Sequence, residues 1–193
     1  MNERSRESTR QRILSASQKV FAEHGYTGAN MRLIAQGAAV SVGCVYLYFK
    51  CKDELYLTLL ESWMNELDAR TTDALENIVE PAEALAAFIT TGIVYAREHK
   101  EMVLLQGRDL GFARGLEMKQ QFLRKRRSLI EDIVRKGVAT GIFCDCDPGE
   151  AAKLIFCSMR GFIVTMMMGE EALYSPEAGV ELLLNGLLRR DTP

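Results

Sequence analysis

Apolar residues recur every three or four positions along much of the chain, and this spacing constrains the fold more than any other sequence feature. The pattern is clear in Leu55, Leu59, Trp63 and Leu67, which follow one another at intervals of four. This is the period of an amphipathic α-helix. Strand-like alternation of apolar and polar residues does not occur, and there are only four prolines in 193 residues. The sequence therefore predicts an all-α protein.

Glycines, prolines and capping residues divide this pattern into about nine helices. The expected ranges are 9–24, 31–37, 42–48, a longer helix from 52, 81–99, 102–108, 116–140, 148–168 and 176–189. An N-terminal three-helix unit, residues 1–52, is expected to precede an antiparallel helical bundle formed by residues 53–193.

Short sequence signals mark the ends of the first three helices. Ser8 and Gln11 have the spacing of a capping box at the start of the first helix. Gly25 is expected to end that helix in a left-handed conformation. Asn30 and Ser41 are expected to be the N-caps of the second and third helices, because their side-chain oxygens can accept from free backbone N–H groups.

Charge is distributed unevenly along the chain. Residues 1–60 carry eight Lys or Arg against five Asp or Glu, whereas the remainder carries sixteen against twenty-one. A polyanionic partner would therefore prefer the N-terminal part. No uncharged apolar run of about 18 residues predicts a membrane span, and the charged first residues argue against secretion. The five cysteines, irregularly spaced, are expected to be reduced thiols in the cytoplasm.

Two short helices, 31–37 and 42–48, joined by a tight turn predict a helix-turn-helix. The second helix must be thin enough to enter the major groove of DNA. Gly43 and Cys44 leave room for this approach, and Val45 with Phe49 can point into a small core. The motif indicates a DNA-binding protein.

Residues in and around this motif carry a specific resemblance. They are Gly25, Tyr26, Ile34, Ala35, Val40, Ser41, Gly43, Tyr46, Tyr48, Phe49, Lys52 and Leu55. In order and spacing they resemble the N-terminal signature of the tetracycline-repressor (TetR) family. The resemblance implies a homodimer with a C-terminal bundle that binds a ligand and dimerises, and a ligand that releases the operator DNA. Ala39 departs from the pattern, because family members usually have glycine there, and a left-handed alanine costs on the order of 1 kcal/mol.

The resemblance also implies which residues touch DNA. Phosphate contacts are expected from Asn30, Arg32, Ser41, Tyr46, Tyr48 and Lys52, and base-edge contacts from Val42, Gly43 and Cys44. The two tyrosines could instead pack the three-helix core. The arginines at 4, 6, 10 and 12 would form either an arm on the phosphates or a solvated, disordered tail. Because valine and cysteine offer few hydrogen bonds, much of the specificity is expected from DNA shape.

Aromatic and methionine side chains on helices expected to face one another predict a pocket for a largely apolar, medium-sized effector. The candidate lining residues are Trp63, Phe88, Tyr95, Phe122, Phe156 and Met159. Arg160 would either anchor an acidic ligand or form an ion pair. The excess of leucine in 176–189 predicts a two-fold dimer through the last two helices.

Other sequence features favour no second activity. The basic run Arg124–Arg127 lies within a long helix and is expected to be a solvated face. Cys144 and Cys146 provide two thiolates in a loop, too few to predict a metal site. Neither histidine has an evident catalytic partner, and no cofactor is expected. The sequence thus favours a ligand-responsive regulator, a repressor rather than an activator, over an all-α enzyme or a helical interaction protein.

Overall fold

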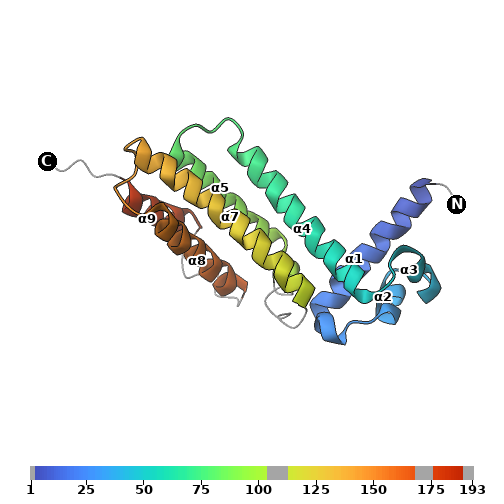
Figure 1. Ribbon diagram of the computed structural model, residues 1–193. Coiled ribbons are helices and arrows are strands. Elements are labelled where there is room, and N and C mark those ends of the chain that lie inside the picture. Colours follow the sequence, from blue (N-terminus) through green and yellow to red (C-terminus); the bar gives the residue numbers. More distant parts are fainter. Residues whose placement is uncertain (1–2, 104–112, 168–175, 189–193) are drawn as a thin grey trace. The chain divides into compact units, whose positions relative to one another are not determined.

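The computed structural model describes residues 3–103, 113–167 and 176–188. Its named helices are α1 (Glu3–Gly28), α2 (Met31–Gly37), α3 (Val42–Tyr48), α4 (Lys52–Leu75), α5 (Pro81–Glu98), α7 (Ala113–Ala139), α8 (Pro148–Met167) and α9 (Pro176–Leu187) (Figure 1). Residues 100–103 are also helical, and the rest of the predicted helix 102–108 lies outside the described residues. The described residues form no strand, only an isolated bridge between Phe143 and Leu188. The predicted all-α fold of about nine helices is confirmed.

The start of α1 differs from the prediction. The helix begins at Glu3, because residues before Ser8 already join its hydrogen-bonding pattern. The Thr9 hydroxyl donates to the carbonyl of Ser5 at 2.9 Å, so Ser8 is not an N-cap. Gly25 interrupts the helix with φ 66° and ψ 174°, a conformation open to glycine. The predicted end corresponds to this interruption, after which one further turn reaches Gly28.

The boundaries of α2 and α3 are those that the capping residues predict. The Asn30 side chain accepts from the N–H groups of Arg32 and Leu33 at 3.1 and 3.0 Å. The Ser41 hydroxyl accepts from the N–H of Cys44 at 3.1 Å. The two helices meet at a bend of 100°, which lies in the range of a helix-turn-helix.

The chain divides into two compact units. The first unit is Met1–Asn65 with His99–Met118, and the second is Glu66–Glu98 with Lys119–Pro193. The division falls within α4, whereas the sequence placed the boundary at the start of that helix. That residues 1–52 bind DNA and residues 53–193 bind a ligand stays a prediction.

In the first unit, fully buried apolar side chains from four helices form the core. They are Ile13, Phe21, Ile34, Val45 and Leu55, with Phe49 nearly buried. The ring of Tyr56 packs edge-on against Phe21, with 5.4 Å between ring centroids. The Phe21–Tyr56 contact joins α1 to α4, and α3 packs against α2.

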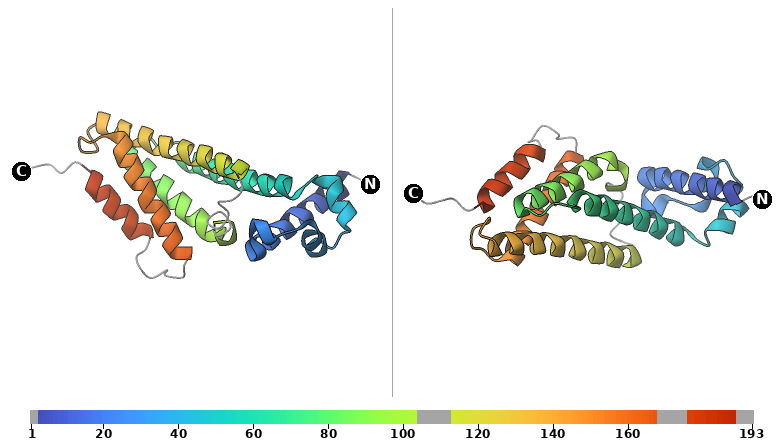
Figure 2. Two further views of the ribbon diagram at one scale, coloured as in Figure 1. Left: turned by 60° about the horizontal axis from the view of Figure 1, so that its bottom comes forward. Right: turned by 90° about the horizontal axis from the view of Figure 1, so that it is seen from above.

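In the second unit, α5 packs against both α8 and α9, as the two views of Figure 2 show. Its buried core includes Leu85, Phe88, Ile89, Ile130, Val134, Phe143, Ala152 and Ile155. Phe143 lies directly over Gly137 of α7. A Cβ at Gly137 would lie 2.1 Å from the Phe143 ring, so only glycine permits this packing.

Candidate DNA interface and inner cavity

The two faces of α3 differ sharply. Val45 is fully buried and packs toward the core of the first unit. On the opposite face, Tyr46 is 52% exposed and Leu47 is 81% exposed. Gly43 is also exposed, and a Cβ placed there would meet no atom closer than the Ser41 hydroxyl at 3.9 Å. The recognition helix therefore presents a thin, uncharged surface to solvent.

The two predicted tyrosine contacts have different surroundings. Tyr46 lies on the solvent face of α3. Tyr48 is half-buried, and within the described residues its buried hydroxyl has no hydrogen-bond partner. The alternative that the tyrosines pack the core thus fits Tyr48 better than Tyr46. DNA contact by either residue stays a prediction.

The remaining predicted phosphate contacts surround this face. Asn30 and Ser41 use their side-chain oxygens as helix caps. Arg32 is exposed at the first turn of α2. Val42 is exposed and Cys44 is half-buried, so the predicted base-edge residues reach solvent to different degrees.

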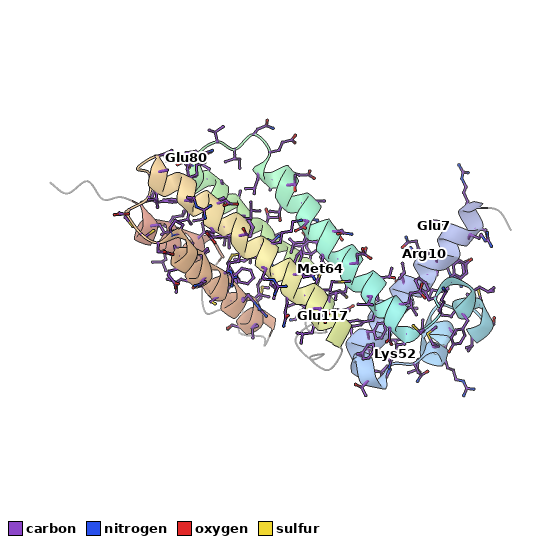
Figure 3. The ribbon with its side chains drawn as sticks, in the orientation of Figure 1. Glu7, Arg10, Lys52, Met64, Glu80 and Glu117 are labelled. Atoms are coloured by element: carbon purple, nitrogen blue, oxygen red, sulfur yellow. The ribbon has the colours of Figure 1, made fainter. Side chains whose placement is uncertain are left out.

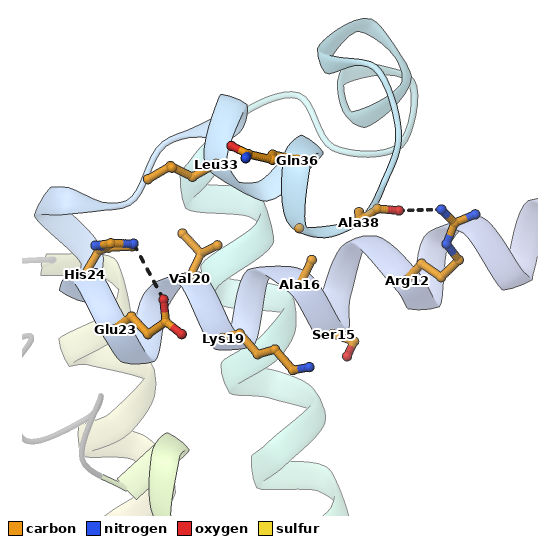
Figure 4. A pocket seen from close by; sticks show the side chains of 11 residues that line it. Arg12, Ser15, Ala16, Lys19, Val20, Glu23, His24, Leu33, Gln36 and Ala38 are labelled. Atoms are coloured by element: carbon orange, nitrogen blue, oxygen red, sulfur yellow. Dashed lines mark hydrogen bonds and ion pairs between the residues drawn. The ribbon is translucent and has the colours of Figure 1, made fainter.

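The turn between α2 and α3 is held from α1. Ala39 has φ 51°, so the predicted left-handed alanine is present. The Arg12 guanidinium donates to the carbonyls of Ala38 and Ala39, at 2.5 and 3.1 Å. The first of these bonds is visible at one end of a surface groove of 520 Å³ between α1 and α2 (Figure 4).

The N-terminal arginines lie on helix α1, not on a disordered tail. Arg4 and Arg6 are exposed. Arg10 instead places its guanidinium 5.4 Å from the centroid of the Phe49 ring. Together with Arg12, it stabilises the motif from α1, which leaves the exposed pair as candidates for the predicted arm.

Lys52 lies at the start of α4 (Figure 3) and has intramolecular partners. Its Nζ donates to the carbonyls of Tyr26 and Ala29 at 2.6 and 3.0 Å. It also lies 4.4 Å from the centroid of the Tyr26 ring. Burial raises the pKa of Tyr26, and its hydroxyl donates to Asp53, which raises the pKa further. The ammonium therefore caps the end of α1, and its predicted phosphate contact is not supported by these contacts.

Leu47 was not among the predicted contacts. Its position could have been inferred, because Val45 and Phe49 point inward at a spacing of four, and Leu47, halfway between them, falls on the opposite face of a helix. An exposed leucine of this size beside Tyr46 is suited to the methyl groups and sugars of a DNA groove.

The second unit contains an apolar cavity of 260 Å³. It lies between α5, α8 and α9 and is lined by Ile89, Ile93, Ser158, Met159, Phe162, Gly179, Val180, Leu182 and Leu183. Of the predicted ligand residues, Met159 lines this cavity. Phe88 is fully buried in the adjacent core, and Phe156 packs against that core.

The other predicted ligand residues lie elsewhere. Tyr95 is fully buried, and its hydroxyl donates to Glu66 at 3.2 Å. Phe122 is buried on α7, and Trp63 is half-buried in the first unit. Arg160 is exposed. Ligand contact by these residues stays a prediction.

The basic run on α7 is only partly exposed. Arg124, Lys125 and Arg127 are exposed as expected, but Arg126 is buried, with 5% of the residue exposed. The prediction of a solvated face is therefore wrong for Arg126. Its spacing of four from both Phe122 and Ile130, which are buried, was the signal that could have placed it inside.

The described residues contain no group of three or more His, Cys, Asp or Glu side chains placed to hold a metal ion. No single helix among them is long and apolar enough to cross a membrane; the bent pair α2 and α3 passes on length and composition alone.

Residues 13–59 match the family model described as bacterial regulatory proteins, tetR family. The DNA-binding part of the chain is thus similar to that of the tetR family. The matched segment runs from α1 into α4 and contains the whole helix-turn-helix. The protein is thus a DNA-binding transcriptional regulator.

Similar proteins extend this match beyond the motif. The chain is 25% identical to the fatty acid metabolism regulator protein of Bacillus subtilis, over 91% of this chain and 93% of the relative. It is 27% identical to the transcriptional repressor KstR2 of Mycobacterium tuberculosis, over 70% of each. The crystal structure of FadR from Bacillus subtilis with stearoyl-CoA superposes with a TM-score of 0.77 at 23% identity, covering 91% of this chain and 98% of that one.

Proposed function

We propose that the protein is a repressor that binds a near-palindromic operator as a homodimer and leaves it when a small, mainly hydrophobic effector binds. The observation that carries this proposal is the exposed, uncharged face of α3 on a rigidly capped helix-turn-helix. At Gly43 such a helix can approach the major groove without a side chain in its way. A regulator of this kind works where the chromosome is, so we also propose a cytoplasmic location.

Phosphate contacts position such a protein, and base contacts give it specificity. Tyr46, on the recognition helix, and Arg32, on α2, are both exposed polar residues, which suits contacts with phosphates. Val42 and Leu47 are apolar and exposed, which suits thymine methyl groups. With few hydrogen-bonding groups on this face, DNA shape supplies much of the specificity.

The dimer proposal rests on exposed apolar residues of α8 and α9. Leu154, Val164 and Leu182 are all more than half exposed in the single chain. Two-fold pairing through this face would cover them and would present two recognition helices to a palindromic site.

The effector proposal rests on the apolar cavity between α5, α8 and α9. The similar FadR structure contains stearoyl-CoA, a molecule with a long apolar chain. The repressor assignment rests on the likeness to KstR2, which is described as a transcriptional repressor.

Titration of DNA from upstream of the protein's own gene, at two salt concentrations, tests this function. We expect the intact protein to bind that duplex more tightly than an unrelated one. Arg32→Gln should weaken binding to both and reduce the salt slope by about one unit, because one phosphate contact is lost. Val42→Ala should change the preference between operators and leave the salt slope unchanged.

Arg127→Gln is the matched control, because Arg127 is an exposed arginine on α7, outside the motif. It should leave affinity and salt slope unchanged. An intact protein that does not distinguish its upstream DNA from an unrelated duplex would contradict the proposed function.

A further inference from the structure

Arg126 is a buried cation in the second unit that the DNA-binding role does not use. Its side chain is 6% exposed, although its neighbours in the basic run are exposed. The guanidinium lies 4.5 Å from the centroid of the Phe88 ring and 5.7 Å from that of Phe122. The charge is thus placed between two aromatic rings inside the bundle.

The polar partners of Arg126 are few. Within the described part of the chain it makes one hydrogen bond, from Nη1 to the Thr71 hydroxyl at 3.1 Å. The nearest carboxylate, Asp68, is 3.8 Å from Nη1 and also pairs with Lys125 at 2.5 Å. A guanidinium has five N–H donors, and buried charges are normally paired and fully hydrogen-bonded. Burial lowers the pKa of Arg126 to about 10, so the group is still charged near neutral pH.

Nη2 of Arg126 lies near the methyl group of Met159, a residue that lines the apolar cavity. A Cβ built on Gly92 would lie 3.5 Å from Nη2 of Arg126 and 3.1 Å from the Met159 methyl group, so both atoms flank the same point. Met159 also lines the cavity, together with Ile89 and Ile93. Methionine is unbranched and flexible, so a change of its rotamer would open the cavity to the charge.

We propose that the effector is a monocarboxylate with an apolar chain, held by Arg126 at its carboxylate and by the α5–α8–α9 cavity along its chain. This inference rests on the proposed function, which places an effector inside the second unit. The planar fork of a guanidinium matches a carboxylate through two parallel hydrogen bonds. Arg126 and Lys125 place two positive charges beside the one negative charge of Asp68, so the site can balance one further negative charge. This favours a monoanion over a phosphate or another multiply charged group.

The same contacts attach Arg126 to α4. Thr71 and Asp68 are both on α4, the helix that begins at Lys52 directly after the helix-turn-helix. A bound carboxylate would compete with these two residues for Arg126. The ligand would then favour an arrangement in which α4 is no longer held by Arg126, and such a difference in interaction is what a conformational change requires.

Calorimetric titration of the intact protein with decanoate, 1-decanol and decyltrimethylammonium, each below the concentration at which micelles form, tests the inference. The three probes share an apolar chain and differ in head-group charge. We expect the affinity for decanoate to be at least about tenfold higher than the affinity for decanol, a ratio typical of one charged pair. Arg126→Gln should remove that preference and keep the binding of decanol, whereas Arg127→Gln should leave both unchanged.

Asp68→Asn is a second variant, and it should change the affinity for decanoate in the opposite direction. It removes the carboxylate that competes for Arg126 and leaves the cavity intact, so decanoate should bind severalfold more tightly. This result does not depend on whether Arg126→Gln folds, which circular dichroism will show.

Three outcomes would overturn the inference: decanol or decyltrimethylammonium binding as tightly as decanoate, a preference for decanoate that survives Arg126→Gln, or unchanged decanoate affinity in Asp68→Asn. Binding of upstream DNA is measured in parallel. If the protein binds that DNA but shows no preference for decanoate, the inference fails and the proposed function stands. If it binds no duplex, the proposed function fails.

Discussion

Ala39 is an alanine in a conformation that favours glycine, and the residues around it explain how it is tolerated. The left-handed region brings the Cβ of an L-residue close to the following carbonyl oxygen, at a cost of about 1–2 kcal/mol. Arg12 donates to the carbonyls of Ala38 and Ala39, which fixes the turn from α1. The geometry of the helix-turn-helix is thus maintained by a side chain from outside it.

We expect Ala39→Gly to raise the free energy of unfolding by about 0.5–1 kcal/mol, because glycine adopts φ 51° without the steric penalty. Ala38→Gly is the matched control. Ala38 is buried with φ −83°, so there glycine should destabilise. Urea unfolding followed by circular dichroism measures both. Equal effects of the two substitutions would show that the backbone conformation is not the cause.

Lys52 is expected to stabilise the fold, whereas its sequence position suggests a phosphate contact. We expect Lys52→Met to lower the free energy of unfolding by about 1–3 kcal/mol, because the carbonyls of Tyr26 and Ala29 lose a charged donor. The neighbouring Lys50 has an exposed side chain, so Lys50→Met should change stability little. Thermal unfolding of the two variants would decide. If only DNA affinity and salt slope change in Lys52→Met, the residue is a phosphate contact after all.

At the scale of helices, glycine has opposite roles in α3 and α7. Gly43 faces open space, whereas Gly137 lies against the Phe143 ring. Gly43→Ala should raise the free energy of unfolding by up to about 1 kcal/mol, since alanine favours helix. It should also weaken operator binding, because the added methyl group faces the DNA.

Gly137→Ala should instead lower the free energy of unfolding by about 1–3 kcal/mol through overpacking. Both variants replace glycine with alanine. A difference between the unfolding midpoints of Gly43→Ala and Gly137→Ala therefore measures the effect of the surroundings of each glycine. Gly137→Ala with a midpoint equal to or above that of the wild type would contradict the packing described for Phe143.

Helices whose ends are set by nearby residues could be predicted from the sequence, and burial that depends on distant residues could not. Asn30 and Ser41 cap α2 and α3 through contacts two or three positions away, so local pattern was sufficient. The start of α1 was predicted too late because Ser8, a good cap, lies within a segment that is already helical. The partners of Arg126, at Thr71 and Phe88, are far away in sequence, so its role in the candidate site required the fold.

At the scale of the whole molecule, the exposed leucines of α8 and α9 predict assembly. We expect the protein to be a dimer at micromolar concentration and Leu154→Glu to be a monomer, since Leu154 is 67% exposed and a carboxylate there would be buried at the interface. Val79→Glu is the control, because Val79 is equally apolar and 75% exposed but lies between α4 and α5. Light scattering that finds wild type and Leu154→Glu in the same state would contradict this interface.

The attachment of Arg126 to α4 through Thr71 and Asp68 has a consequence for how sensitively such a regulator responds. If carboxylate and operator act on α4 in opposite directions, linkage requires each to weaken the other by the same factor. Operator-bound protein would then need a higher effector concentration than free protein. The threshold for release would rise with the number of operator sites in the cell, so the dose response would depend on gene copy number as well as on the affinity of the cavity.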